Sequence, residues 1–171
     1  LMQAMDEAGL EYTLFSDIQP NPTDENVEAG LVKYREGRCQ AIVAFGGGSP
    51  MDCAKGIAAR LAHPHRSISR LQGLLTVHKK IVPIWAIPTT SGTGSETTVA
   101  AVLTVAKTRH KASINDPMIM PHHAVLDPEL TVGLPPFITA TTGLDALCHA
   151  VESYTNWTYL TGLEKDFAKK A

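Results

Sequence analysis

The chain has 171 residues, of which 44% are hydrophobic and 19% are charged, a composition typical of a folded globular protein. Fifteen Lys and Arg against seventeen Asp and Glu give a net charge of -2 with no long run of either sign. This balance argues against a nucleic-acid-binding tract and against a polybasic membrane anchor. The apolar runs are far shorter than the roughly 18 residues that a membrane-spanning helix needs. We therefore expect a small-molecule partner, with no nucleic acid and no membrane involved.

The cysteine count and the two ends of the chain give two further expectations. Cys39, Cys53 and Cys148 are an odd number of cysteines without CxxC spacing, which favours a reducing compartment, and we expect the cytoplasm. The chain opens at Leu1 inside one helical pattern and stops at Ala171 inside another, without a capping or breaking residue. We expect both ends to be internal to a longer protein.

Helical and strand-like patterns alternate in the first part of the chain. Residues 1–10 have helical spacing, and residues 11–15 alternate as in a strand. Thr23 is a candidate N-cap for a helix that ends at Gly37. The apolar run at 40–45 predicts a strand buried on both faces, and it leads directly into a glycine-rich turn and another helix.

Further strands are predicted before the pattern becomes purely helical. Residues 79–88 predict a second buried strand, and residues 99–105 and 110–115 predict two strands joined by a polar turn. Residues 124–130 predict one more short strand followed by a turn. From Pro135 onward the apolar spacing is helical, and we expect Cys148 to be a small buried side chain of that helix.

This order of elements predicts an α/β fold with a mostly parallel sheet, followed by the start of an all-helical domain. We place the division between residues 1–134 and residues 135–171. In open α/β sheets, ligands bind outside the carboxyl ends of the strands, and a small-residue loop follows each of the two predicted buried strands. We expect these two loops to share one cleft.

The first of these loops, FGGGSPMD (45–52), combines glycines with a helix start at Ser49 and Pro50. Glycines with positive φ let the backbone approach a ligand, and the free N–H groups and dipole of the helix favour a pyrophosphate. The alternative is a simple tight turn, because Met51 interrupts GxGxxG and Lys55 lacks the neighbours of a Walker motif.

The second loop, PTTSGTGSETT (88–98), has a density of hydroxyl and backbone donors that suits phosphate, ribose or amide recognition. It can also be a flexible loop with an N-cap. Lys111 would add a positive charge beside these loops, or it is a solvated surface lysine. Asp52 lies in the first turn of its predicted helix, where the dipole favours a carboxylate even without a ligand, and a contact to ribose or amide stays open.

Asp145 and His149, in TGLDALCHAVESY (142–154), are four residues apart inside a helical segment. This spacing places both side chains on one face, where a carboxylate oxygen and an imidazole nitrogen can converge on Fe²⁺ or Zn²⁺. Two ligands do not complete such a site, so the alternative is a hydrogen-bonded pair on a helix surface.

Four segments together resemble the iron-containing (group III) alcohol dehydrogenases, in the superfamily that includes glycerol dehydrogenase and dehydroquinate synthase. In chain order they are QPNPTDENVEAGL, GGGSPMDCAKGIA, PTTSGTGSETT and LDPELTVGLPPFITATTGLDALCHAVESY. The resemblance implies that 1–134 is a dinucleotide-binding domain without its first elements and that 135–171 begins a helical metal-binding domain. It also implies a homodimer or larger homo-oligomer.

The resemblance also implies site residues and a reaction. Asp145 and His149 would be catalytic metal ligands for Fe²⁺, with Zn²⁺ as the alternative. The residues that would bind NAD or NADP are Gly47, Gly48, Ser49, Asp52, Thr89, Thr90, Thr93, Ser95, Lys111 and Leu130. The implied reaction is hydride transfer between a small alcohol or aldehyde and the nicotinamide, with the metal polarising the substrate oxygen.

Two departures from the family leave alternatives open. The family supplies two further histidine ligands beyond the segment that ends at Tyr154, and its first strand is missing here. We therefore expect the chain by itself to bind metal poorly and to turn over little. The alternatives are a lyase resembling dehydroquinate synthase, and a non-catalytic nucleotide-binding fragment.

Overall fold

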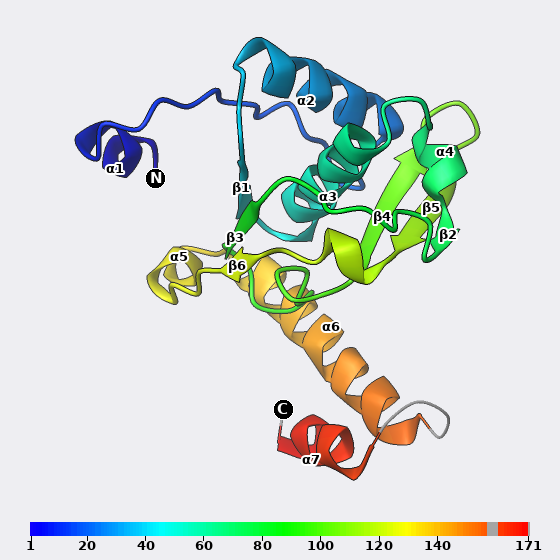
Figure 1. Cartoon of the computed structure of the whole chain (residues 1–171). Coiled ribbons are helices and arrows are strands. Elements are labelled where there is room, and N and C mark those ends of the chain that lie inside the picture. The colour runs from blue at the N-terminus through cyan, green and yellow to red at the C-terminus, as the bar shows by residue number, and fades with distance from the viewer. Residues whose placement is uncertain (157–160, 171) are drawn as a thin grey trace.

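The chain folds into helices and two small sheets (Figure 1). The computed structural model describes residues 1–156 and 161–170. The helices are α1 (Met2–Glu7), α2 (Asp24–Glu36), α3 (Gly48–Ala62), α4 (Ile68–Leu71), α5 (Glu129–Val132), α6 (Pro136–Thr155) and α7 (Gly162–Lys170), with a 3-10 helix η1 (Pro117–Ile119). The strands are β1 (Ile42–Gly46), β2 (Gly73–Leu74), β3 (Ile84–Pro88), β4 (Ala100–Val105), β5 (His110–Asn115) and β6 (His123–Ala124). The predicted α/β fold class is confirmed.

The strand pairings are mostly parallel, as predicted. One sheet has the order β1-β3-β6, and both of its pairings are parallel. The other has the order β2-β5-β4, in which β2 is parallel to β5 and β4 is antiparallel to it. The antiparallel pair is the predicted pair of strands joined by a polar turn.

The β1-β3-β6 sheet brings the ends of its strands to one edge. Because the strands are parallel and Gly46 lies opposite Pro88, the chain leaves β1 and β3 at the same place. β1 leads into α3, and β3 leads into residues 89–99. The two small-residue loops therefore lie at one edge, as their expected sharing of one cleft requires, and the shared cleft itself stays a prediction.

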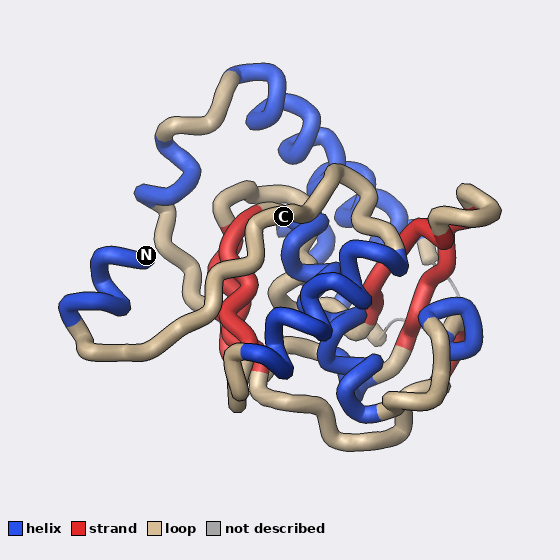
Figure 2. The backbone as a smooth tube through the Cα atoms, turned by 90° about the horizontal axis from the view of Figure 1, so that it is seen from above, coloured by secondary structure: helices blue, strands red, loops and turns tan. Residues whose placement is uncertain are grey.

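Helix α3 lies between the two sheets and forms the centre of the hydrophobic core (Figures 1 and 2). Its buried side chains include Met51, Cys53 and Ile57, and α2 packs against it.

The N-cap of α2 is the predicted one: the Thr23 hydroxyl accepts a hydrogen bond from the Asn26 N–H, and the Asn26 side chain accepts one from the Thr23 N–H. This capping box satisfies two backbone donors at the start of the helix.

Several strand predictions are wrong. Residues 11–15 form no strand, because strand formation needs a hydrogen-bonded neighbour and no described strand pairs with them. β1 is not buried on both faces, because Val43 and Phe45 are each 41% exposed on one face of the sheet. The predicted strand at 79–88 forms only over Ile84–Pro88, and the one predicted within 124–130 is limited to β6, which is followed by α5.

Helix α6 extends away from the edge that carries the two loops, and α7 lies at the far end of α6 (Figure 1). Neither helix has a buried residue in the part of the chain that the structure describes, and they pack against each other. The prediction that Cys148 is buried is therefore wrong: its side chain is exposed. α6 begins at Pro136, close to the predicted division at 134/135, and the division into two domains stays a prediction.

Candidate functional site

The glycine loop, residues 46–50, joins β1 to α3. Of the three glycines only Gly46 has positive φ, at 142°, where an added Cβ would lie 2.7 Å from Pro50 Cγ. Gly47 is the N-cap of α3 and offers no side chain to the first-turn N–H groups. These donors and the positive end of the helix dipole therefore suit an anion such as a pyrophosphate.

The second loop, residues 88–98, packs directly against the glycine loop. The Thr89 N–H donates a hydrogen bond to the Gly46 carbonyl at 2.9 Å. An added Cβ at Gly47 would lie 3.2 Å from Thr90 Oγ1, and one at Gly48 would lie 3.1 Å from Thr93 Cγ2. Gly47 and Gly48 thus allow close packing of the two loops, and neither has positive φ. The structure brings Gly47, Gly48, Thr89, Thr90 and Thr93 together, as predicted.

A buried lysine joins α3 to the far end of the second loop. Lys55 has 0% exposure. Its ammonium donates hydrogen bonds to Ser95 Oγ at 3.2 Å, to the Thr98 carbonyl at 3.1 Å and hydroxyl at 2.9 Å, and to the Ala100 carbonyl at 2.8 Å. Burial lowers the pKa of Lys55 from its ordinary 10.5 to about 8, although the negative charges of Asp52 and Glu96 oppose the shift.

Asp52 belongs to the same buried network. Its carboxylate accepts hydrogen bonds from Ser95 Oγ at 2.9 Å and from the Val102 N–H at 3.0 Å. Burial raises the pKa of Asp52, while these bonds and the Lys55 charge act in the opposite direction. α3 begins at Gly48, so Asp52 is outside its first turn, and the explanation by helix dipole is wrong. The carboxylate is held by the second loop and β4 instead.

Ser95 lies at the centre of this network, and its side chain is already engaged. It is 5% exposed, and its hydroxyl donates to Asp52 and accepts from Lys55. Direct contacts of Ser95 and Asp52 with a cofactor stay predictions. Lys55 is not among the site residues predicted from the sequence, where it enters only as a poor match to a Walker motif; a lone lysine within the apolar segment DCAKGIAA is the signal that points to it.

The second loop also reaches helix α6. An added Cβ at Gly92 would lie 2.3 Å from the Thr142 carbonyl oxygen. A groove of about 510 Å³ lies between the loop, α6 and α7. Its lining residues are Gly92, Thr93, Gly94, Thr97, Thr98, Ala146, His149, Ala150, Ser153, Glu164, Phe167 and Ala168. The predicted metal ligand His149 therefore lines the same groove as the second loop.

Asp145 and His149 lie together on α6, as the spacing predicts. Asp145 Oδ2 is 3.6 Å from His149 Nε2, and the side chains are 47% and 59% exposed. Two ligands about 2.1 Å from one ion at a tetrahedral angle lie about 3.4 Å apart, so this separation fits a shared Fe²⁺ or Zn²⁺. No group of three or more His, Cys, Asp or Glu within 1–156 and 161–170 is placed to hold a metal. Their role as metal ligands stays a prediction.

Three other predicted contacts lie around this centre. Ser49 is the second residue of α3 and is half-buried beside the loops. Lys111 is exposed on β5 opposite Thr104, whereas the second loop enters β4 at Ala100, so Lys111 lies further along the hairpin. Leu130 is half-buried in α5, which follows β6. The roles of all three in cofactor binding stay predictions.

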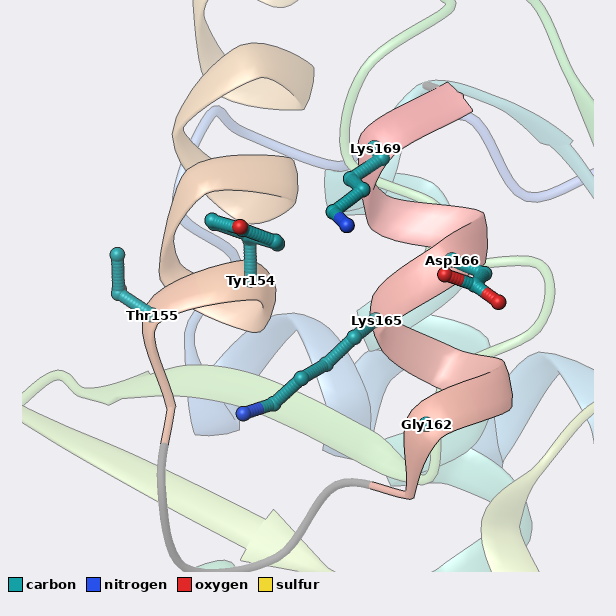
Figure 3. Close-up of a pocket in the computed structure, with 6 residues that line it drawn as sticks. All are labelled: Tyr154, Thr155, Gly162, Lys165, Asp166 and Lys169. Atoms are coloured by element: carbon teal, nitrogen blue, oxygen red, sulfur yellow. The ribbon is translucent and has the colours of Figure 1, made fainter.

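A second hollow, of about 500 Å³, lies at the C-terminal end of α6 (Figure 3). Tyr154 of α6 lies on the side that faces Lys165 and Lys169 of α7, whereas the Thr155 side chain points away from α7 (Figure 3). Lys169 Nζ is 5.4 Å from the centre of the Tyr154 ring, a cation–π contact that ties the two helices together. None of the predicted site residues lines this hollow.

The fold and the two joined loops define an α/β protein with a helical extension, in which the loops lie where ligands bind in open α/β sheets. A sequence model described as iron-containing alcohol dehydrogenase matches residues 1–128. The NAD-dependent methanol dehydrogenase of Bacillus methanolicus is 45% identical over 148 residues, which are 86% of this chain and 39% of that protein. The chain belongs to the iron-containing alcohol dehydrogenase family.

Solved structures extend the similarity to the helical part. The crystal structure of a 1,3-propanediol oxidoreductase has a TM-score of 0.93 at 39% identity and covers 98% of this chain and 43% of that one. Sulfoacetaldehyde reductase from Bifidobacterium kashiwanohense, in complex with NAD⁺, has a TM-score of 0.82 at 38% identity, covering 94% and 43%. The chain spans about two fifths of the length of the curated relatives it matches.

Proposed function

We propose that this chain is part of an alcohol dehydrogenase that transfers a hydride between a small alcohol or aldehyde and NAD(P) with the help of a divalent metal. The observation that carries the proposal is the position of His149, which lines one groove with the second loop, while the glycine loop packs against Thr90 and Thr93 of that same loop. The relatives support a dehydrogenase rather than a lyase resembling dehydroquinate synthase.

Each part of the site has a separate task in this proposal. When bound, the nicotinamide exchanges the hydride and the metal polarises the substrate oxygen. The N–H groups at Gly48 and Ser49 bind the pyrophosphate at the start of α3. Asp145 and His149 hold the metal from α6. The second loop, which contacts both α3 and α6, fixes the distance between the two binding sites.

The same proposal includes a choice of cofactor, of metal, of cellular location and of assembly. NAD is favoured by the NAD-dependent methanol dehydrogenase and by the NAD⁺ complex among the similar proteins, with NADP as the alternative. Fe²⁺ follows from the family, and Zn²⁺ suits the same carboxylate and imidazole. The three free cysteines fit a cytoplasmic location. No described helix is long and apolar enough to cross a bilayer. We also propose a homodimer or larger homo-oligomer.

The experiment uses the longer polypeptide to which we propose this chain belongs. It is loaded with Fe²⁺ or Zn²⁺ without oxygen, and short primary alcohols and diols are tested with NAD⁺ and NADP⁺ at the reduced-nicotinamide absorbance band. We expect His149→Ala to lower kcat by about a hundredfold or more while NADH binding persists, because a metal ligand is lost but the loops are intact.

Cys148→Ala is the matched control, since its exposed side chain is adjacent in sequence on the same helix. It should retain turnover and metal content. Absence of turnover by the unmodified protein with every alcohol, metal and cofactor in the panel would contradict the proposed function.

A further inference from the structure

Charges of opposite sign are separated along this chain. Residues 1–23 contain acidic side chains and no lysine or arginine, whereas residues 53–95 contain lysines and arginines and no acidic side chain. The acidic residues of the first segment are Asp6, Glu7, Glu11 and Asp17. The basic residues of the second segment are Lys55, Arg60, Arg66, Arg70, Lys79 and Lys80. The small net charge of -2 therefore combines two segments of opposite sign.

These charges lie at opposite ends of the molecule. Helix α1 lies at one end, and α4 and β2 lie at the other (Figure 1). We call residues 1–17 the acidic end and residues 62–80 the basic end. All the acidic side chains of the acidic end are exposed. Lys55 and Arg60 are buried in α3, and the exposed cations of the basic end are Arg66, Arg70, Lys79 and Lys80.

The basic end is compact because its loop folds back onto the end of α3. The Arg66 guanidinium donates a hydrogen bond to the Thr76 carbonyl at 3.3 Å, and the Lys79 ammonium donates one to the Ala62 carbonyl at 3.4 Å. These bonds bring cations from both sides of α4 and β2 to one surface. The cations therefore act together on a partner.

Two leucines project from the basic end. Leu74 is 78% exposed and Leu75 is 53% exposed, and Leu75 has a φ of 52°, which residues with a side chain rarely adopt. The loop is held there by Asp116, which is 1% exposed and accepts hydrogen bonds from the N–H groups of Val77 at 2.8 Å and His78 at 3.0 Å. A buried carboxylate thus fixes a loop that keeps large apolar side chains in solvent, as a contact surface does.

The acidic end also carries exposed apolar side chains. They are Leu1, Met2, Leu10, Tyr12 and Leu14. Each end therefore combines apolar side chains with charges of one sign, and the two signs are opposite. Two basic ends repel each other, so a symmetric pairing of like ends is unfavourable, whereas the basic end of one copy is complementary to the acidic end of another.

We propose that the basic end of one copy binds the acidic end of the next, so that the protein associates head to tail. Such a contact uses two different surfaces of each copy, and it extends into an open chain or closes into a ring. This inference rests on the homo-oligomer of the proposed function, but it does not depend on hydride transfer. The glycine loop, the second loop and α6 lie outside both ends.

The test reverses the charge of each end in the longer polypeptide and measures its mass by sedimentation velocity over a range of protein and salt concentrations. Arg70→Glu with Lys80→Glu makes the basic end more acidic, and Glu7→Lys with Glu11→Lys makes the acidic end more basic. Each variant alone should raise the Kd of self-association by about tenfold or more at low salt, because its two ends no longer attract each other. A mixture of the two variants should associate again, since the reversed ends are complementary.

Two controls separate this contact from a general effect of charge. Lys33→Glu with Arg35→Glu changes the net charge by the same amount on α2, outside both ends, and should leave the Kd unchanged. Leu74→Ala should weaken association at high salt as well, because it removes apolar contact area that salt does not screen. The charge reversals leave the bonds of Arg66 and Lys79 within the loop intact.

Three results would overturn the head-to-tail contact. They are an unmodified protein whose mass does not rise with its concentration at low salt, reversal variants that associate as the unmodified protein does, and a mixture that associates no more than its separate components. In each case a different partner, or the additional residues of the longer polypeptide, covers the basic end. Absence of turnover with the head-to-tail association intact contradicts the proposed reaction instead.

Discussion

Lys55 shows how one buried charge can be tolerated in a small α/β protein. Its environment combines four oxygen acceptors with two carboxylates, Asp52 and Glu96, whose charges favour the ammonium. Burial nevertheless dominates and lowers the pKa to about 8. The bonds satisfy the donors of the group, but they do not fully replace the water that the charge has lost.

This pKa predicts how stability depends on pH. Because the folded pKa of about 8 lies below the ordinary 10.5, the unfolded state binds more protons between these values. The burial cost of the charge is therefore fully present below about pH 8 and is relieved as the pH rises toward 10.5. We expect the free energy of unfolding of the wild-type protein, minus that of Lys55→Met, to increase with pH across this window.

Urea unfolding of both proteins at pH values on either side of 8 measures this difference. Groups other than Lys55 titrate in both proteins and cancel in the subtraction. A difference that does not change with pH, or that falls as the pH rises, contradicts the assignment of the lowered pKa to Lys55.

At the scale of elements, the contact between the second loop and α6 depends on one missing side chain. Gly92 approaches Thr142 so closely that an added Cβ would lie 2.3 Å from its carbonyl oxygen and 2.8 Å from its Cβ. The backbone of a helix cannot move aside as a flexible side chain can. Gly92 therefore allows the loop to touch the helix that carries Asp145 and His149.

We expect Gly92→Ala to separate the loop from α6 and to destabilise the protein by about 1–3 kcal/mol, as overpacking does elsewhere. Gly143→Ala is the matched control, because it lies one residue further along α6 with no atom within 4 Å of an added Cβ. In a helix interior that change should stabilise by about 0.5–1 kcal/mol. Thermal and urea unfolding measure both, and equal shifts in the two variants would refute the close contact.

The elements that the sequence could predict are those that depend on residues close together in the chain. Thr23 and Asn26 cap a helix through residues three apart, and the glycine loop lies between adjacent elements, so local patterns were sufficient. The Lys55 bonds join residues 40 to 45 positions apart, and no local pattern encodes such a pairing. The strand predicted at 11–15 failed for a related reason, because pairing depends on a neighbour elsewhere in the chain.

At the scale of the whole molecule, two apolar faces are open in the described residues. One is the face of the β1-β3-β6 sheet that carries Val43 and Phe45. The other is on α6, where Leu144, Leu147 and Val151 are more than half exposed. Apolar faces of a sheet or a helix are stable when another layer of the protein covers them. The relatives are longer than this chain, and in the longer polypeptide that we propose, the additional residues would cover these two faces.

This proposal predicts how the 171-residue chain binds metal by itself. Asp145 and His149 give it two ligands, and no third lies beside them among the described residues. We expect its affinity for Zn²⁺ to be more than about a hundredfold weaker than that of the longer polypeptide, since even loss of a residue that supports a ligand costs about 10–100-fold. Isothermal titration of both proteins measures the difference.

Two variants assign whatever binding the short chain retains. His149→Ala should remove it, because one of the two ligands is lost. Cys148→Ser tests the exposed neighbouring thiol as a competing Zn²⁺ ligand and should leave the affinity unchanged. If the short chain binds Zn²⁺ as tightly as the longer polypeptide and His149→Ala has no effect, Asp145 and His149 are not the metal ligands, and the metal part of the proposed function fails.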